Sequence, residues 1–349
     1  MLRSTLQLGG LLLLGLLSNI SHAAVVKDLY TAEVTVVDHS QQALASAASE
    51  ALSEVLVKVS GSVTVLENPA ISSALGNSRS YVQQYAYTQD DASSGELSAR
   101  FEFDDSIIAG LVAEAGVPFW TANRPSVLVW MVIEGPEGRQ FLSGESVPEM
   151  MLGLEREFVR RGVPSQFPLY DLDDSAIISV DELWRLAAPA IQQASVRYGV
   201  QDILAGRLVS LSNGNWAGDW SYFFERSRID RSIGAGSQEA FLQAGADLVA
   251  GEMSARFAVA PSAKVAGGVK VLVTGVSSYH DYASIVAWLE GLELVEYANI
   301  ETISGDEIRL NLVAQADAQQ LAAIIELNKH LLPLASPERT TPLSYQWQK

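Results

Sequence analysis

The clearest pattern of apolar and polar positions lies between Val127 and Phe224, where strand and helix signals alternate. The continuously apolar run 127–133 predicts a strand that is covered on both faces. A helix with one apolar face follows. The spacing of Ser146 and Glu149 is that of a capping box at the start of this helix, and Gly162 is expected to end it.

The same order of signals then repeats along the chain. An extended stretch at 164–170 precedes a second helix, which Ser179 caps and Pro189 kinks or splits. A buried strand at 202–209 and a hairpin at Asn213-Gly214 complete the pattern. These signals predict a mostly parallel central sheet with helices packed on it and an antiparallel edge.

Shorter strand and helix patterns flank this central part. Residues 24–122 alternate between strand and helix signals and predict a small N-terminal α/β domain, with Gly61 ending its long first helix. The central domain is expected to span 125–260. Residues 268–349 carry the order βαββαβ, which predicts a ferredoxin-like domain. The predicted class is therefore α/β (α+β), built from several small αβ domains.

Residues 1–23 have the form of a signal peptide. Arg3 supplies a short positive region, Leu6–Leu17 is a compact apolar run, and Ser21-His22-Ala23 is a small-x-small site, which predicts cleavage after Ala23. An uncleaved anchor is the alternative, but the run is shorter than the ~20 residues that a span requires. We expect export to a bacterial periplasm and no stable membrane insertion after cleavage.

Composition and charge narrow the class of protein. With 48% hydrophobic and 18% charged residues among 349, the chain is expected to be globular and to have several domains. The net charge of −18 repels nucleic acid, so no nucleic-acid partner is expected. Because the chain has no cysteine, disulfides and thiol chemistry are excluded.

Motifs that carry chemistry are hard to find. The histidines that remain after cleavage, His39, His280 and His330, are isolated from one another, and no serine lies in a GxSxG or SxxK motif. The Gly267-Gly268 pair precedes a strand, which is the wrong order for a phosphate-binding loop. We therefore expect no catalytic residue, no metal site and no cofactor.

One acidic cluster remains a candidate binding site. Asp171, Asp173 and Asp174 follow the second predicted strand of the central domain, at the edge where open α/β sheets place their ligands. The cluster could bind a cation or supply an acid and a base. The alternative is a solvated acidic turn.

One set of aromatic residues is a second candidate. Trp216, Trp220 and Tyr222 lie at even spacing on one face of a predicted strand. Such a face could stack on a sugar. The alternative is an apolar face packed on a helix or on a neighbouring domain.

Several segments together resemble a known family. They are the helix segment 51–61, the 124–130 entry into the central domain, and the 202–207 strand with Trp216 and Trp220 beyond it. This combination resembles the uncharacterised exported family of Gram-negative bacteria known as domain of unknown function 2066. The resemblance covers most of the mature chain and brings no catalytic residues.

The central domain is also similar to the periplasmic α/β domains of the TolB amino-terminal and CsgG types. The likeness rests on the strand and helix order, with Arg160-Arg161-Gly162-Val163, Tyr198-Gly199-Val200 and Ile203-Leu204-Ala205-Gly206. Those families build envelope assemblies and bind partner proteins without catalysing reactions. The chain lacks the lipobox cysteine and the pore strands of the CsgG type, so the likeness does not extend to pore formation.

Together these observations favour a non-catalytic periplasmic protein that binds an envelope protein or itself. Two alternatives belong to other classes. One is an envelope hydrolase that uses the acidic cluster, and the other is a small-ligand carrier with a pocket between the first two domains.

Overall fold

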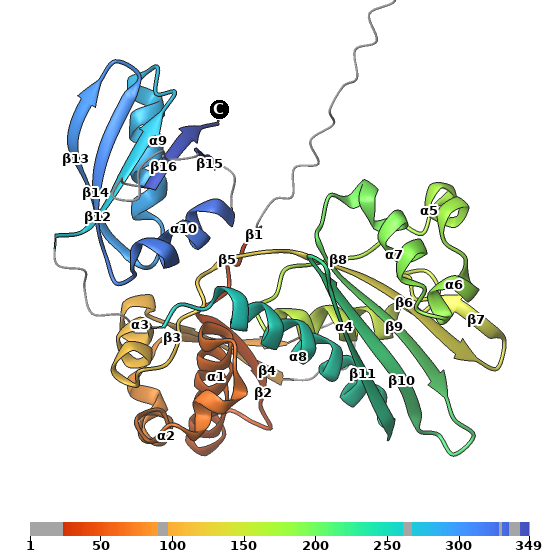
Figure 1. Cartoon of the computed structure of the whole chain (residues 1–349). Coiled ribbons are helices and arrows are strands. Elements are labelled where there is room, and N and C mark those ends of the chain that lie inside the picture. The colour runs from red at the N-terminus through yellow and green to blue at the C-terminus, as the bar shows by residue number, and fades with distance from the viewer. Residues whose placement is uncertain (1–23, 90–96, 261–266, 328–329, 335–342, 349) are drawn as a thin grey trace, which may run out of the picture.

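The computed structural model describes residues 24–89, 97–260, 267–327, 330–334 and 343–348. The predicted signal peptide falls on residues 1–23, which lie outside the described residues. Helices and mixed sheets alternate along the chain, so the predicted α+β class is confirmed. Figure 1 shows three modules, which we call the N-terminal module (24–122), the central module (123–260) and the C-terminal module (267–348).

The N-terminal module is a three-stranded antiparallel sheet in the order β2-β4-β3, packed on the helix α1. Its strands are β2 (Thr31–Thr35), β3 (Val82–Gln89) and β4 (Leu97–Phe103), and β1 (Ala24–Val25) precedes them. Its helices are α1 (Gln41–Ser60), the 3-10 helices η1 (Val63–Glu67) and η2 (Ser78–Ser80), α2 (Pro69–Gly76) and α3 (Asp105–Glu114). Ser40 caps α1. Gly61 ends the helix with a φ of 74°, as the sequence predicts.

The central module contains a six-stranded sheet in the order β11-β10-β9-β6-β7, with β8 paired to the start of β6. Its strands are β6 (Val127–Gly135), β7 (Gly138–Phe141), β8 (Ser165–Gln166), β9 (Asp202–Ser210), β10 (Trp216–Phe224) and β11 (Ser227–Gly236). The prediction of a mostly parallel sheet is wrong. Only the pairings of β6 with β9 and with β8 are parallel, whereas β6–β7, β9–β10 and β10–β11 are antiparallel.

The short strand β8 explains much of this difference. Residues 164–170 were expected to form a full parallel strand, but only Ser165–Gln166 pairs with β6. Pro164 and Pro168 flank this pair, and a proline has no N–H to donate to a ladder. The sheet is therefore extended by hairpins.

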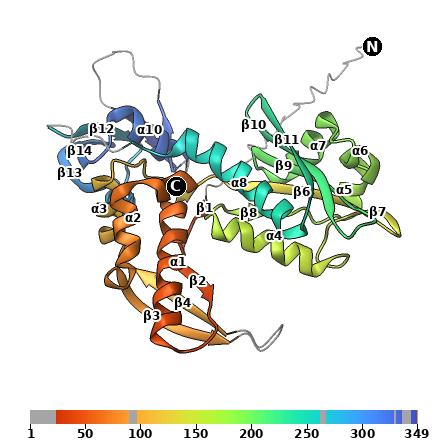
Figure 2. The same ribbon diagram turned by 90° about the horizontal axis from the view of Figure 1, so that it is seen from below.

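Helices cover both faces of the central sheet, which makes three layers (Figure 2). They are α4 (Pro148–Arg160), α5 (Leu172–Ile177), α6 (Val180–Trp184), α7 (Ala188–Ser195), the 3-10 helix η3 (Val196–Tyr198) and α8 (Gln238–Phe257). Alternate side chains of β6 point to opposite layers: Val129 packs with α4 and α8, whereas Trp130 packs with α6 and α7. Strand β6 is thus buried on both faces, as predicted.

Two of the predicted helix signals have different outcomes. The capping box of Ser179 and Glu182 is present at α6, and Pro189 lies in the first turn of α7, so the second helix is split as expected. The capping box of Ser146 is absent. The helix α4 begins at Pro148, so its N-cap position is Val147, whose side chain cannot accept a hydrogen bond, and the Ser146 hydroxyl donates to the Phe141 carbonyl instead.

The C-terminal module contains the predicted βαββαβ order and one additional strand. Its strands are β12 (Val269–Thr274), β13 (Val295–Ser304), β14 (Glu307–Ala314), β15 (Leu331–Pro333) and β16 (Leu343–Trp347), and its helices are α9 (Tyr279–Glu290) and α10 (Ala318–Leu327). The sheet order is β13-β14-β12-β16-β15. Because β15 forms the outer edge, β16 returns antiparallel to it and pairs parallel with β12, where a ferredoxin-like sheet has an antiparallel neighbour.

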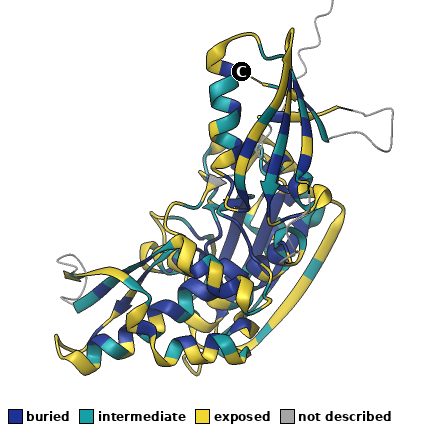
Figure 3. Ribbon diagram, turned by 90° about the vertical axis from the view of Figure 1, so that its left-hand side faces the viewer, coloured by how far each residue is buried: buried dark blue, intermediate teal, exposed yellow. Residues whose placement is uncertain are grey.

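The segment 119–124 connects all three modules. Here β5 (Asn123–Arg124) pairs with β1, and Phe119 pairs with Val259 just after α8. Asn123 donates to the Ile324 carbonyl of α10, and the buried apolar residues of the N-terminal and C-terminal modules form one connected cluster. Figure 3 shows the buried positions along the strands and on the inner helix faces. Within the described residues, no helix combines the length and apolar character needed to cross a bilayer.

Candidate functional site

A cleft of about 760 Å³ lies between the N-terminal and central modules, and we call it the junction cleft. One wall is formed by the end of α1, the η1 helix and the loop that follows α3. The other wall is α8, and the residue after α4 lies between them. The lining residues are Ser60, Gly61, Ser62, Val63, Thr64, Val65, Glu67, Asn68, Ala115, Gly116, Val117, Pro118, Arg161, Asp247, Gly251, Ser254, Ala255 and Ala258.

The α8 wall consists mainly of small side chains. Gly251, Ser254, Ala255 and Ala258 recur at helical spacing, so they share one face of α8 or its end. At one point the two walls touch, because the Ser254 hydroxyl donates to the Gly61 carbonyl at 3.2 Å. Small side chains on this face leave the space that the cleft occupies.

Arg161 is the buried cation of the junction cleft. Its side chain is only 3% exposed, and its Nη2 donates to the Gly61 carbonyl at 3.0 Å. Its Nε lies 3.2 Å from Asp247 Oδ1, which is also 3.5 Å from Arg160 Nη2. Within the described residues, Arg161 Nη1 and Asp247 Oδ1 are buried and form no hydrogen bond of good geometry. Burial lowers the pKa of Arg161, and the Asp247 carboxylate opposes this change.

Arg124 lies beside this cation and holds the two modules together. It is fully buried, and its guanidinium lies 3.7 Å over the Trp120 ring. Its Nη2 donates to the carbonyl oxygens of Lys58 and Trp120, and its Nη1 to that of Gly162, each at 2.8 Å. Lys58 is in the last turn of α1 and Gly162 follows α4, so the negative ends of two helix dipoles point at one guanidinium. Burial lowers the pKa of Arg124 to about 9.

The hydroxyl groups of the junction cleft are bonded to the backbone or to each other. Ser60 Oγ donates to the Ser62 carbonyl, the Ser62 and Thr64 hydroxyls lie 2.8 Å apart, and Ser254 Oγ donates to the Gly61 and Gly251 carbonyls. The described lining residues include no histidine, lysine, cysteine or tyrosine. Each hydroxyl group of the junction cleft is therefore held by a backbone carbonyl or by a neighbouring hydroxyl.

The acidic cluster is held by internal interactions. Asp171 caps α5 and pairs with both terminal nitrogens of Arg197, at 2.7 and 3.0 Å. Asp174 is 1% exposed and accepts hydrogen bonds from the Tyr170 amide and the Tyr198 hydroxyl. The Asp173 side chain is 82% exposed. The carboxylates of Asp171 and Asp174 therefore stabilise the start of α5. No group of three or more metal-binding side chains occurs among the described residues.

Asp171→Asn is expected to lower stability near neutral pH and to have a smaller effect in acid. The Arg197 guanidinium lowers the pKa of Asp171 from 3.8 to about 2. A carboxyl group with a depressed folded-state pKa stabilises the fold above its unfolded pKa, and this contribution is lost as pH falls through the folded value. Melting temperatures of both proteins between pH 7 and pH 2 should converge at the acidic end. A difference in melting temperature that stays constant from pH 7 to pH 2 would contradict a stabilising role for the ionised Asp171 carboxylate.

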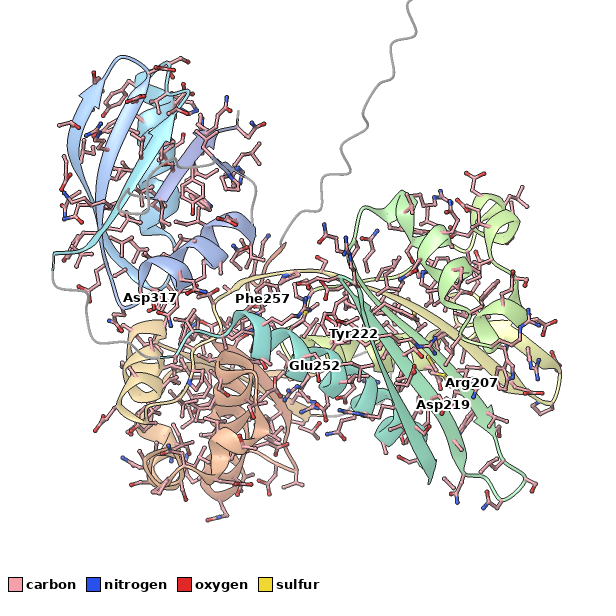
Figure 4. The ribbon with its side chains drawn as sticks, viewed as in Figure 1. Arg207, Asp219, Tyr222, Glu252, Phe257 and Asp317 are labelled. Atoms are coloured by element: carbon pink, nitrogen blue, oxygen red, sulfur yellow. The ribbon has the colours of Figure 1, made fainter. Side chains whose placement is uncertain are left out.

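The aromatic candidates form part of the core under α8. Trp220 is fully buried and donates from its indole nitrogen to the Phe241 carbonyl at 2.9 Å, with its ring between Gly206 and Gly245. Tyr222 is also fully buried and donates to Asp202; Figure 4 shows it on the sheet near α8. Trp216 is half-buried against the same core. A sugar-stacking face is therefore wrong for Trp220 and Tyr222, because their rings are covered.

Neither residue of the central arginine pair was found from the sequence. Arg124 was noted only as part of the entry into the central domain, and Arg161 only as part of a likeness to other families. Both side chains donate to backbone carbonyls of distant segments, and the sequence around an arginine does not indicate such contacts. The one available signal was Gly61 and Gly162, two glycines that end long helices.

Comparison with known proteins covers one part of the chain. A family model described as "Domain of unknown function (DUF8605)" matches residues 23–121, which include the α1 and η1 wall of the junction cleft. This is a different domain of unknown function from the one that the sequence segments resemble, so that resemblance stays a prediction. No curated protein matches the chain.

Proposed function

We propose that this protein is a non-catalytic periplasmic binding protein that holds a segment of an envelope protein in the junction cleft. The observation that carries the proposal is the pair Arg161 and Asp247. Arg161 Nη1 is a buried donor with no hydrogen-bond partner among the described residues, and it lies beside an open cleft together with the Asp247 carboxylate, which pairs with Arg161 Nε. Unsatisfied buried polar atoms cost free energy, which a bound group can recover.

A polypeptide segment fits these two groups better than the alternative ligands do. Each peptide unit offers a carbonyl acceptor for Arg161 and an N–H donor for Asp247. The carrier alternative needs a deep apolar pocket, whereas this cleft is open and contains hydroxyl groups. The hydrolase alternative uses the acidic cluster, which does not line the junction cleft and whose Asp171 and Asp174 carboxylates are engaged by Arg197 and Tyr198.

The sequence supports the compartment and the class of partner. The predicted signal peptide and the absence of cysteine support export to the periplasm. The resemblance to domain of unknown function 2066, and the likeness of the central domain to periplasmic domains that bind envelope proteins, support a protein partner. The partner could also be a second copy of this chain, and the test below distinguishes a second copy from an envelope protein.

Ala255→Trp is expected to reduce partner recovery at least about tenfold, a loss of about 1.4 kcal/mol. Ala255 is exposed on the cleft face of α8, so an indole at this position fills the junction cleft without entering the core. The measurement is recovery of a crosslinked polypeptide from envelope extract by the purified chain.

The matched control is Ala240→Trp, an exposed alanine in the first turn of the same helix and outside the junction cleft. It should recover the partner as the unchanged chain does. Equal recovery by both variants would refute the cleft as the binding site. Adducts that contain only this chain, and that are lost with Ala255→Trp, would show that the occupant is a second copy.

A further inference from the structure

The strand β11 forms a long free edge of the central sheet. It is the terminal strand in the sheet order, and Figures 1 and 2 show it at the margin of the sheet. From Ser227 to Ile233 it pairs with β10 without interruption, and the only register shift lies beyond this stretch. None of its residues lines the junction cleft. It is therefore a second surface, independent of the one that the proposed function uses.

The free edge presents unpaired backbone groups in a rigid strand. The hairpin closes with Phe224 opposite Ser227, so the amides of Arg228, Asp230 and Ser232 point away from β10. Ile229 and Ile233 pack on the core below and hold the strand in place. Natural proteins blunt such edges with prolines, bulges, short strands or charged side chains. The stretch from Ser227 to Ile233 has no proline, bulge or break, and the charged side chains Arg228, Asp230 and Arg231 are its one feature of this kind.

The charged side chains near this edge indicate which charge a partner strand should carry. The side chains of Arg226 and Arg231 are exposed and make no hydrogen bond or ion pair within the described part of the chain. Arg228 is tied to Asp230 at 2.8 Å and to the Leu186 carbonyl. The chain as a whole has a net charge of −18, so these two cations are opposite in sign to most of its surface charge. Opposite charges across neighbouring strands stabilise pairing, whereas like charges oppose it.

We propose that the edge of β11 is a docking site for an extended, acidic segment of another protein, which adds to the central sheet as an extra strand. Backbone hydrogen bonds supply the contact, and Arg226 and Arg231 select an acidic sequence. A second copy of this chain is disfavoured, because it would place arginine-bearing strands side by side and bring together two bodies of strong negative charge.

The test uses a ten-residue peptide of alternating glutamate and valine as the probe, with a lysine–valine peptide for comparison. The purified chain should bind the acidic peptide at least about tenfold more tightly, and added salt should weaken this binding. The double variant Arg226→Glu/Arg231→Glu should lose binding by at least the same factor. The matched control Arg156→Glu/Arg309→Glu makes the same change in net charge at exposed arginines of α4 and β14, away from β11, and should bind normally.

Hydrogen exchange separates strand addition from simple charge attraction. Bound acidic peptide should protect the outward amides of Arg228, Asp230 and Ser232. Binding without this protection, equal binding of the lysine peptide, or equal loss in the control variant would overturn the proposal. Protection that appears without peptide as protein concentration rises would also overturn it, because the occupant would then be a second copy.

Discussion

Replacing Arg124 with methionine is expected to destabilise the protein by about 3–5 kcal/mol. The side chain is fully buried and donates to carbonyl oxygens of Lys58, Trp120 and Gly162. Methionine fills much of the volume but donates no hydrogen bond, so these buried oxygens lose their donor. The carbonyls belong to both the N-terminal and the central module, and the two modules should separate more readily in the variant.

Chemical denaturation measures the loss, and limited proteolysis near residues 119–124 measures the separation of the modules. Arg156→Met is the matched control, because Arg156 is exposed on α4 and its replacement should change stability by about 0.5 kcal/mol or less. A loss below about 1 kcal/mol for Arg124→Met would mean that water or a local shift satisfies the freed carbonyls. In that case Arg124 would not be what holds the junction.

The sequence predicted those elements whose signals are local. The run 127–133 is apolar at every position, and burial on both faces of β6 follows from that pattern alone. Likewise the cap at Ser179 and the break at Pro189 depend on neighbours within one turn. Such signals require no knowledge of what lies across the molecule.

Strand partners were predicted less well, because pairing is decided by segments far apart in the chain. The sequence of β16 gives a strand but not its direction relative to β12, which depends on the added strand β15. For β8 the two flanking prolines were visible, but their effect on the length of the ladder was missed. The parallel content of the central sheet was overestimated for this reason.

The sequence offered a pocket between the first two domains as one alternative, but the residues that line the junction cleft could not be predicted, because its walls come from separate modules. The even spacing of Trp220 and Tyr222 correctly gave one face of a strand, but not the helix that covers it. A signal for that helix was present in Gly245, where a Cβ would lie 2.6 Å from the Trp220 ring. A glycine inside a helix destabilises it, so its presence at a helix–sheet contact indicates close packing.

Gly61→Ala is expected to destabilise the protein by about 2–5 kcal/mol, through two separate costs. Gly61 has a φ of 74°, a conformation that costs other residues roughly 1–2 kcal/mol. A Cβ at this position would also lie 2.1 Å from the Ser254 Cβ, and such overpacking typically costs ~1–3 kcal/mol. Denaturation of the variant measures the sum. Gly61 is where the two walls of the junction cleft touch, so relief of this clash would move α8 away from α1.

Gly116→Ala separates the two costs. Gly116 has a similar φ of 67°, but an added Cβ would have no atom within 4 Å, so only the backbone cost of roughly 1–2 kcal/mol is expected. The difference between the variants therefore measures the contact between Gly61 and Ser254. Adding Ser254→Gly to Gly61→Ala removes the Cβ that clashes and should recover much of that difference. Equal losses for the two alanine variants would mean that α8 is free to shift at this point, and that the cleft is not held at a fixed width.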